Sequence, residues 1–146
     1  METENAQKPE KVYARFTTEM KVRPDDIDLF QHVHSSRYMD YLLAARFDQM
    51  ERCYKMPMSE YLERGMGWYQ TSITMNYKRS LTLGDEFIVE TGITKFGVCT
   101  IDLSYRIIKK STNKVCVDGT ATYALIDLKT QRAMRIPQDV IDRHTI

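Results

Sequence analysis

The sequence has no excess of charge of either sign, with 21 Lys and Arg against 20 Asp and Glu and a formal net charge of +1. A nucleic-acid-binding surface usually shows as a basic excess, so we expect no nucleic-acid partner. No apolar stretch approaches the roughly 20 residues that a membrane span needs, so we expect no membrane partner. Residues 1–11 are polar and lack the apolar run of a secretory signal, so we expect a cytoplasmic protein.

Cysteine is scarce and irregularly placed. There are three cysteines, an odd number, and no C-x-x-C pair. This argues against a disulfide framework and a structural zinc site, and it favours reduced thiols in the cytoplasm. The nearest approach to a metal-binding pattern is His32 and His34 with Asp28, for which no fourth ligand suggests itself. We therefore expect neither a metal nor a redox cofactor.

The length of 146 residues fits one domain with a substantial core. A hydrophobic content of 42% and a charged content of 28% are those of an ordinary soluble globular protein. We expect residues 1–12 to form a flexible tail and residues 13–146 to form a single domain. Residues 13–23 alternate imperfectly and predict a first strand that ends at Pro24.

Residues 38–50 predict a long helix, with Ser35 or Ser36 as its N-cap. Apolar residues occupy most sides of its first half, which is typical of a helix that is surrounded by other structure. A second, short helix is predicted over residues 58–64, ended by Gly65. Pro137 predicts the first position of a short C-terminal helix.

Four segments rich in Thr, Val, Ile and Tyr follow the helices: 68–78, 85–96, 98–109 and 114–127. In the third, Ile101, Leu103, Tyr105 and Ile107 fall on one face, which is typical of a half-buried antiparallel strand. Short connections make successive strands neighbours. The order predicts an α+β fold, a five-stranded antiparallel sheet wrapped around a long central helix. Because such a sheet leaves a face or an edge without cover, we expect a homodimer or homotetramer.

The segment from Asp28 to Tyr38 holds the residues best suited to chemistry. It places a carboxylate upstream of two histidines and of two serines at the expected helix start. The N–H groups at a helix start attract developing negative charge. A carboxylate near such a start can act as base or nucleophile while the amides hold an oxyanion. This combination suits attack on a carbonyl group.

Four motifs occur in order along the chain. The strongest is Asp28-x-x-x-His32-Val33-x-x-x-x-Tyr38, followed by Tyr77-Lys78-Arg79-Ser80-Leu81-Thr82-Leu83-Gly84-Asp85 and by the weaker Asp118-Gly119-Thr120-Ala121 and Ile136-Pro137. In this order and spacing they resemble the hotdog-fold acyl-CoA thioesterases of the 4-hydroxybenzoyl-CoA thioesterase-like family, over roughly residues 15–140. The chain departs from the family pattern at Gln31, where Gly is frequent, at His34-Ser35, where Asn-Asn is common, and at Ser80, which replaces Pro.

The resemblance implies a hotdog fold and hydrolysis of an acyl-CoA thioester to the free acid and coenzyme A. The aspartate matching Asp28 would act as nucleophile or activate water. Main-chain amides near His34, Ser35 and Ser36 would polarise the thioester carbonyl, in a site at a dimer interface.

Coenzyme A would place its phosphates near basic side chains, for which Lys78 and Arg79 are candidates. His34 could line the pocket or serve as acid or base. We expect His32 to be a buried, hydrogen-bonded ring that shapes the substrate-binding loop. Tyr38 is expected to be a core aromatic with a tethered hydroxyl beside the substrate.

Two other functions stay open at this point. A hotdog dehydratase or hydratase would need a His–acid pair aimed at the α and β carbons of the acyl group, and hydration of an enoyl-CoA without thioester cleavage would reveal it. A non-catalytic acyl-thioester-binding protein would bind such esters tightly without turnover. The motifs fit thioesters of coenzyme A and of acyl carrier protein alike, and they do not fix the acyl group.

Overall fold

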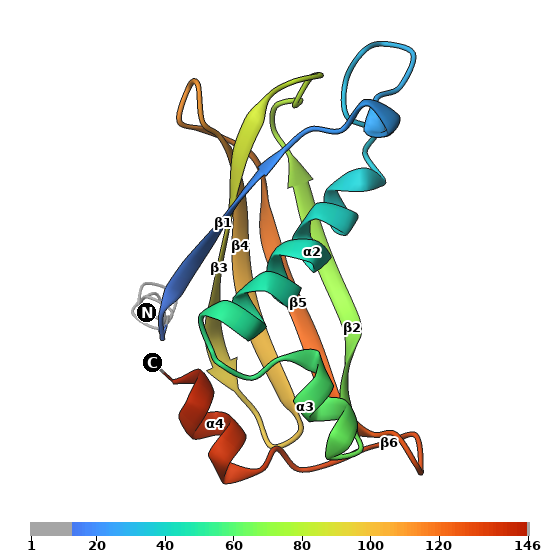
Figure 1. Cartoon of the computed structure of the whole chain (residues 1–146), viewed down its shortest axis with the longest axis vertical. Coiled ribbons are helices and arrows are strands. Elements are labelled where there is room, and N and C mark those ends of the chain that lie inside the picture. Colours follow the sequence, from blue (N-terminus) through green and yellow to red (C-terminus); the bar gives the residue numbers. More distant parts are fainter. Residues whose placement is uncertain (1–12, 146) are drawn as a thin grey trace, which may run out of the picture.

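The computed structural model describes residues 13–145 (Figure 1), so the predicted N-terminal tail, residues 1–12, lies outside the described residues. The strands are β1 (Arg15–Lys21), β2 (Met66–Tyr77), β3 (Glu86–Phe96), β4 (Thr100–Lys109), β5 (Lys114–Asp127) and β6 (Arg132–Ala133). The helices are the 3-10 helix η1 (Pro24–Asp26), α2 (Arg37–Arg52), α3 (Met58–Glu63) and α4 (Gln138–His144).

The strands form one antiparallel sheet with the order β1-β3-β4-β5-β2, and the two-residue β6 pairs with β5. The five longer strands confirm the predicted antiparallel sheet, whereas β6 and η1 were not predicted. On β4, Ile101, Leu103, Tyr105 and Ile107 are all buried, as their alternation predicts. The sheet curls around α2, which lies across one of its faces (Figure 1).

The motif around Gly119 is explained by a close approach of two strands. Gly119 pairs with Met75 of β2, and a Cβ atom at position 119 would lie 1.8 Å from the carbonyl oxygen of Thr74. The hydroxyl of Tyr105 donates to that same carbonyl at 2.6 Å. Only glycine leaves room for both contacts.

Only one side of α2 packs into the core. Tyr38, Leu42 and Ala45 are buried against the sheet, whereas Leu43 and Phe47 are 42% and 54% exposed. The prediction that other structure surrounds this helix is therefore wrong for a single copy of the chain. The reason is that the sheet covers one face of α2 and residues 13–145 form no second layer on the other.

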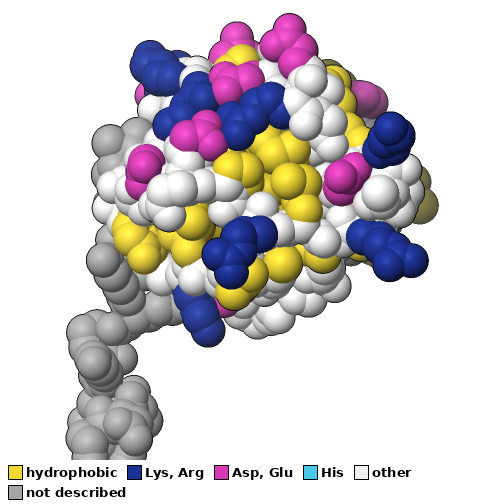
Figure 2. All heavy atoms as spheres, turned by 90° about the horizontal axis from the view of Figure 1, so that it is seen from below, with side chains coloured by type: hydrophobic (Ala, Val, Ile, Leu, Met, Phe, Trp, Pro, Cys, Tyr) yellow, Lys and Arg dark blue, Asp and Glu magenta, His cyan; other side chains and the backbone are white. Residues whose placement is uncertain are grey.

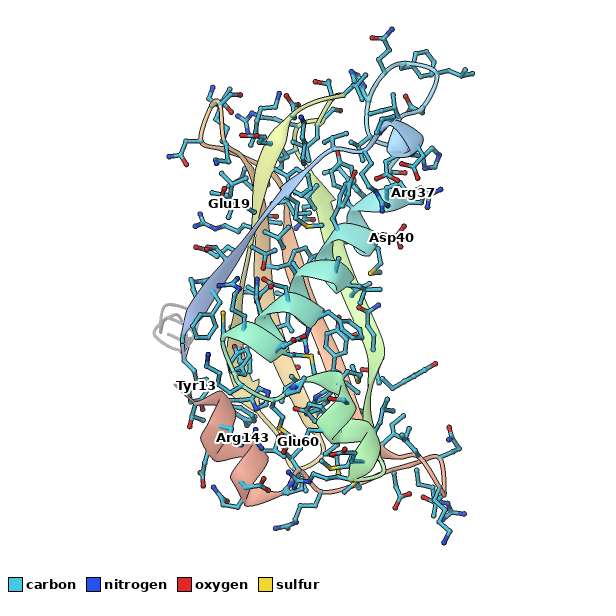
Figure 3. All side chains as sticks on the ribbon, in the orientation of Figure 1. Tyr13, Glu19, Arg37, Asp40, Glu60 and Arg143 are labelled. Atoms are coloured by element: carbon cyan, nitrogen blue, oxygen red, sulfur yellow. The ribbon has the colours of Figure 1, made fainter. Side chains whose placement is uncertain are left out.

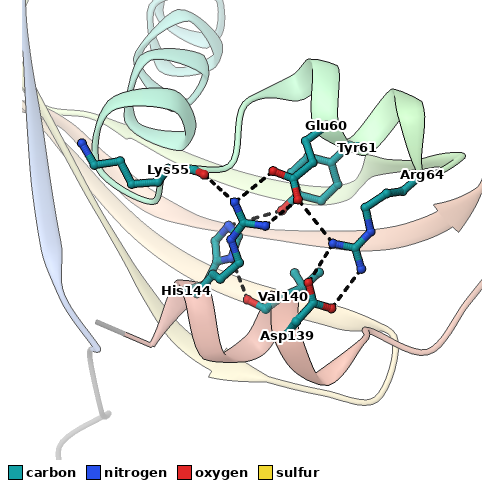
Figure 4. Close-up of polar contacts among 8 residues, drawn as sticks. Lys55, Glu60, Tyr61, Arg64, Asp139, Val140 and His144 are labelled. Carbon is teal, nitrogen blue, oxygen red and sulfur yellow. Dashed lines mark hydrogen bonds and ion pairs between the residues drawn. The ribbon is translucent and has the colours of Figure 1, made fainter.

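The C-terminal end of α2 lies beside α3 and α4, which ion pairs hold together. Arg143 donates to Glu60 at 2.9 Å, and Arg64 donates to both oxygens of Asp139 at 2.8 and 2.9 Å (Figure 4). Seen from this end, apolar side chains lie among both basic and acidic ones (Figure 2). In Figure 3, Glu60 and Arg143 lie at this end, and Arg37 and Asp40 lie at the opposite end of α2.

His144, the last residue of α4, is buried and contacts three residues. Its Nδ1 donates to the carbonyl of Val140 at 2.8 Å, its Nε2 accepts from the hydroxyl of Tyr61 at 3.3 Å, and its ring stacks on Tyr54. Burial lowers the pKa of His144 to about 4. The ring is therefore neutral at neutral pH.

Among residues 13–145, none of the helices has the length and apolar character that a membrane span requires.

Candidate functional site

The loop that carries Asp28 is closed by its own hydrogen bonds. Asp28 Oδ1 accepts from the amides of Phe30 at 2.9 Å and His32 at 3.2 Å, and the Asp28 amide donates to the carbonyl of His32 at 2.9 Å. Gln31 stands inside this turn with a φ of 67°. This is the left-handed region that glycine adopts without strain, which explains why Gly would suit this position.

The loop is attached to the second motif of the sequence. The amide of Val33 donates to the carbonyl of Leu81 at 2.8 Å, and His32 pairs with Thr82 in an isolated antiparallel bridge. Two motifs that are 49 residues apart at Asp28 and Tyr77 are thus brought side by side. Their junction lies beside the N-terminal end of α2.

Most amides at the start of α2 already have acceptors. The His34 amide donates to the carbonyl of Asp26 at 2.9 Å, the Ser36 amide to His34 Nδ1 at 3.2 Å, and the Arg37 amide to the carbonyl of His34 at 2.8 Å. From residue 34 to residue 37, the amide of Ser35 alone has no hydrogen-bond acceptor in the described part of the chain. Ser35 is exposed, so a ligand oxygen can reach this N–H group.

The predicted serine N-cap takes another form. Ser36 occupies the N-cap position, but its side chain makes no capping hydrogen bond to the helix. Its hydroxyl instead pairs with Nδ1 of His34 at 2.8 Å. The His34 imidazole accepts from the Ser36 amide in the way that a side-chain oxygen usually does at a helix start.

A cleft of ≈ 220 Å³ lies between the start of α2 and the segment after β2. Its lining consists of Val33, Ser35, Tyr38, Tyr77, Lys78, Arg79 and Ser80. Four of the predicted site residues, Ser35, Tyr38, Lys78 and Arg79, therefore share this cleft. Asp28, His32, His34 and Ser36 are outside its lining and belong to the adjoining loop.

The two basic residues of the cleft are exposed but differ in their partners. Lys78 Nζ lies 2.8 Å from a carboxylate oxygen of Asp118, and Arg79 donates to the carbonyl of Val115 at 3.0 Å. Arg79 therefore keeps most of its five N–H donors unpaired.

The prediction of a buried side chain is confirmed for Tyr38 but not for His32. Tyr38 is buried, and its hydroxyl accepts from the amide of Leu81 at 3.1 Å, as predicted for a tethered core aromatic. Burial raises the pKa of this hydroxyl. The prediction of a buried ring for His32 is wrong, because its side chain is exposed and its backbone makes the contacts that shape the loop.

Asp26 is the important residue that the sequence analysis left out. Its side chain is 1% exposed and accepts from the hydroxyl of Tyr41 at 2.6 Å and from Arg23 at 3.1 Å, with Arg37 at 3.5 Å. Burial would raise the pKa of this carboxyl, but the hydrogen bonds from Arg23 and Tyr41 and the charges of Arg23 and Arg37 together outweigh burial and lower it. The Arg23–Asp26 spacing of three residues was the signal available in the sequence.

No group of three or more His, Cys, Asp and Glu side chains within the described residues could hold a metal ion. Cys116 is buried, and burial raises the pKa of its thiol, which disfavours the reactive thiolate.

An antiparallel sheet curled around one helix is the arrangement of the hotdog fold. The DHNA-CoA thioesterase of Staphylococcus aureus has the same fold, with a TM-score of 0.81 and 19% identity over 89% of this chain and 86% of that one. The probable thioesterase YbaW of Escherichia coli is similar too, with a TM-score of 0.78 and 26% identity over 89% of this chain and 98% of its own.

The sequence places the chain more narrowly. Residues 22–143 match the thioesterase-like superfamily, and the chain belongs to this family. The long-chain acyl-CoA thioesterase FadM of Escherichia coli (strain K12) is 27% identical over 126 residues, 86% of this chain and 94% of FadM. Family membership supports thioester hydrolysis as the class of reaction.

Proposed function

We propose that this chain hydrolyses acyl-CoA thioesters to the free acid and coenzyme A. Family membership gives the reaction class, and the names of FadM and of the DHNA-CoA thioesterase suggest a coenzyme A ester as substrate. The observation that carries the proposal is the Asp28 carboxylate on a loop joined to a helix start where the amide of Ser35 has no acceptor.

The chemistry assigns two roles. Asp28 acts as general base, removing a proton from the water that attacks the carbonyl carbon, or as nucleophile, forming an anhydride that water then cleaves. Its Oδ1 is held by two amides, so Oδ2 is the oxygen free for either role. The amide of Ser35 donates to the developing oxyanion, a kind of contact whose loss typically costs about 10²–10³ in rate. On the general-base route the C–S bond breaks after water has added, and the thiolate of coenzyme A takes up the proton that Asp28 removed from water. On the nucleophile route the C–S bond breaks as the anhydride forms, and the thiolate takes up a proton from the water that later cleaves the anhydride. No metal or redox cofactor has a part in these steps.

His34 has a supporting role in this scheme. Because its Nδ1 accepts from the Ser36 amide, the ring fixes the backbone turn that exposes the neighbouring Ser35 amide. The exposed Lys78 and Arg79 lie in the same cleft and suit the phosphates of coenzyme A, with Arg79 the better placed because its guanidinium has unpaired donors.

The active form is proposed to be at least a homodimer with the acyl site between subunits. The outer edge of the 12-residue strand β2 has no partner strand within the described chain. Leu43 and Phe47 of α2 and Tyr69 of β2 are also exposed. A long, open strand edge and exposed apolar side chains are the kinds of surface that a second copy covers. A strictly monomeric and fully active species in light scattering would contradict this part of the proposal.

A thiol-release assay with the purified chain tests the function directly. A panel of short, medium, long and aromatic acyl-CoA esters is incubated with the protein, and coenzyme A and free acid are both quantified. We expect release of the two products in equal amounts from at least one ester. No release above the buffer rate across the panel, with tight ester binding or with hydration of an enoyl-CoA, would overturn the proposal.

A further inference from the structure

Arg46, in the middle of α2, has an unusual electrostatic environment. Among the described residues, only three basic side chains are not exposed: Arg46, Lys109 and Arg143. Lys109 lies 3.2 Å from a carboxylate oxygen of Asp85, and Arg143 donates to Glu60 at 2.9 Å. Arg46 has no carboxylate partner within the described chain. A partly buried charge without a counterion is costly, so this position calls for an explanation.

The contacts that Arg46 does make leave its donors unused. Its guanidinium lies over the ring of Tyr123, 4.3 Å from the ring centroid. Its one hydrogen-bond contact is a long one, to the sulfur of Met50 at 4.0 Å. A cation above an aromatic ring is favourable, but this contact uses the face of the guanidinium and not its N–H groups. The N–H groups of Arg46 are therefore available to donate hydrogen bonds to an oxygen acceptor.

A small cavity lies next to Arg46, between α2 and the sheet. Its volume is ≈ 10 Å³, close to the space that one oxygen-sized group needs. Of the residues that line it, Arg46 alone is not buried, so this side chain separates the cavity from solvent. The lining includes Gln49, Thr91 and His144, three of the five buried polar residues of the described chain.

The other polar groups around the cavity are already paired with one another. Gln49 accepts from Thr91 and donates to Thr18 at 3.1 Å and to the carbonyl of Val89 at 3.3 Å. Both ring nitrogens of His144 have partners in α3 and α4 (Figure 4). The site therefore offers a positive charge and unused donors from Arg46 alone, which selects an acceptor oxygen over a donor.

Side chains that contact one another lie between the start of α2 and Arg46. Met39, Leu43 and Arg46 lie three and four residues apart and share one side of the helix. Met39 accepts from Gln70 of β2 at 3.8 Å, Gln70 accepts from the hydroxyl of Tyr123 at 3.0 Å, and Tyr123 lies under Arg46. From Ser36 to Arg46 the helix rises about 15 Å, which an extended acyl chain of medium length spans.

We propose that Arg46, with the cavity behind it, binds an acceptor oxygen at the far end of the acyl group of the substrate. The inference rests on the proposed thioesterase function and narrows its substrate class. The favoured esters carry a carboxylate or a carbonyl oxygen near the distal end of a medium-length chain. Plain alkyl chains of the same length leave the guanidinium without a partner and are the poorer substrates.

The test compares matched substrates on the wild-type chain. Alkanoyl-CoA esters of eight, ten and twelve carbons are each paired with their ω-carboxy and terminal methyl-ketone analogues. We expect kcat/KM at least tenfold higher for the oxygen-bearing ester at one length or more. Equal kcat/KM within each pair at all lengths would overturn the inference while leaving the thioesterase function intact.

Two variants and one binding measurement complete the test. Arg46→Met removes the guanidinium but keeps an unbranched apolar stem, and it should reduce kcat/KM for the preferred oxygen-bearing ester at least tenfold, with less than a threefold change for the alkyl ester. Arg135→Met removes an exposed cation elsewhere and should change neither. Equal losses for both esters in Arg46→Met would indicate a merely structural role.

Calorimetric binding of the free ω-carboxy and alkyl acids to the wild-type chain reports the same preference if no ester is hydrolysed. The failures of the two proposals are therefore distinguishable.

Discussion

The two ends of α2 differ in how completely their polar groups are paired. At the C-terminal end, Glu60, Arg64, Asp139, Arg143 and His144 all have partners from another element. At the N-terminal end, the adjoining loop exposes Leu29 and Phe30, and within residues 13–145 neither Asp28 Oδ2 nor the amide of Ser35 has a hydrogen-bond partner. Groups that are paired within the chain stabilise it, whereas unpaired ones at a helix start remain available to a ligand. The paired groups at the C-terminal end of α2 therefore contribute to stability, and the unpaired groups at its N-terminal end are available for the proposed chemistry.

The largest effect on activity is expected when the charge of Asp28 is removed. In Asp28→Asn the amide side chain can still accept from Phe30 and His32, but it can neither attack the carbonyl nor activate water. We expect kcat to fall at least about 10²-fold with little change in KM, as for the loss of a general base. Because Asp28 lies in an exposed loop, Tm should change by less than about 3 °C. Steady-state kinetics and calorimetry measure both.

Asp25→Asn is the matched control, since Asp25 lies in η1, three residues before Asp28, with its side chain 78% exposed. It should change kcat less than about threefold, well below the loss expected for a general base. A comparable loss of kcat in Asp25→Asn and Asp28→Asn would mean that kcat depends on the overall charge of this segment and not on the Asp28 carboxylate in particular.

Substitution of the buried Asp26 tests whether the N-terminal end of α2 also contributes to the stability of the fold. Asp26→Asn weakens the contacts with Tyr41, Arg23 and Arg37, so the free energy of unfolding should fall by about 2–3 kcal/mol. Urea unfolding measures this change. A loss no larger than that of Asp25→Asn would show that the Asp26 contacts contribute nothing to stability.

His144 makes the C-terminal end sensitive to acid. In the unfolded chain a histidine has a pKa near 6.5, whereas burial lowers the pKa of His144 to about 4 in the fold. As pH falls from 7 to 4.5, the unfolded state takes up a proton that the folded state excludes, so stability is lost by about 2 kcal/mol. Urea unfolding of wild type and His144→Phe is measured at pH 7 and pH 4.5. The free energy of unfolding should fall by about 2 kcal/mol less in the variant than in wild type. An identical pH dependence in both would place the titrating group elsewhere.

The smallest effects are expected from two glutamines in strained turns, one near each end of the molecule. Gln31 has a φ of 67° in the Asp28 loop, and Gln131 has a φ of 61° in the β5–β6 turn. Glycine relieves the strain of positive φ but gives the unfolded chain more freedom, so each Gly variant should gain only about 0.5–1 kcal/mol. Thermal unfolding measures the gain, and kcat should change only in Gln31→Gly. A change of kcat in Gln131→Gly would mean that the two ends are not independent.

Local patterns were enough to predict most of the fold. The alternation in β4 and the apolar run of α2 report on neighbouring residues, and the segments they predict match the observed elements to within a few residues. The motif around Asp28 also predicted a carboxylate loop at the start of α2.

The rest depends on contacts between distant parts of the chain. The Glu60–Arg143 pair joins residues 83 apart, and neither residue carries a local signal for it. Asp26 could not be singled out from the sequence because the charge on Arg37 and the hydroxyl of Tyr41 reach it only when η1 folds against α2. The availability of the Ser35 amide likewise follows from the acceptors that its neighbours find.

The most direct test of the N-terminal site is the rate of thiol release by His34→Ala compared with that of Asp28→Asn, on the best ester of the panel. If Asp28 carries the chemistry and His34 only fixes the helix start, His34→Ala should lose less than about tenfold in kcat and Asp28→Asn at least about 10²-fold. Near-normal hydrolysis by Asp28→Asn, together with abolished hydrolysis by His34→Ala, would contradict the account and assign the proton transfer to the histidine.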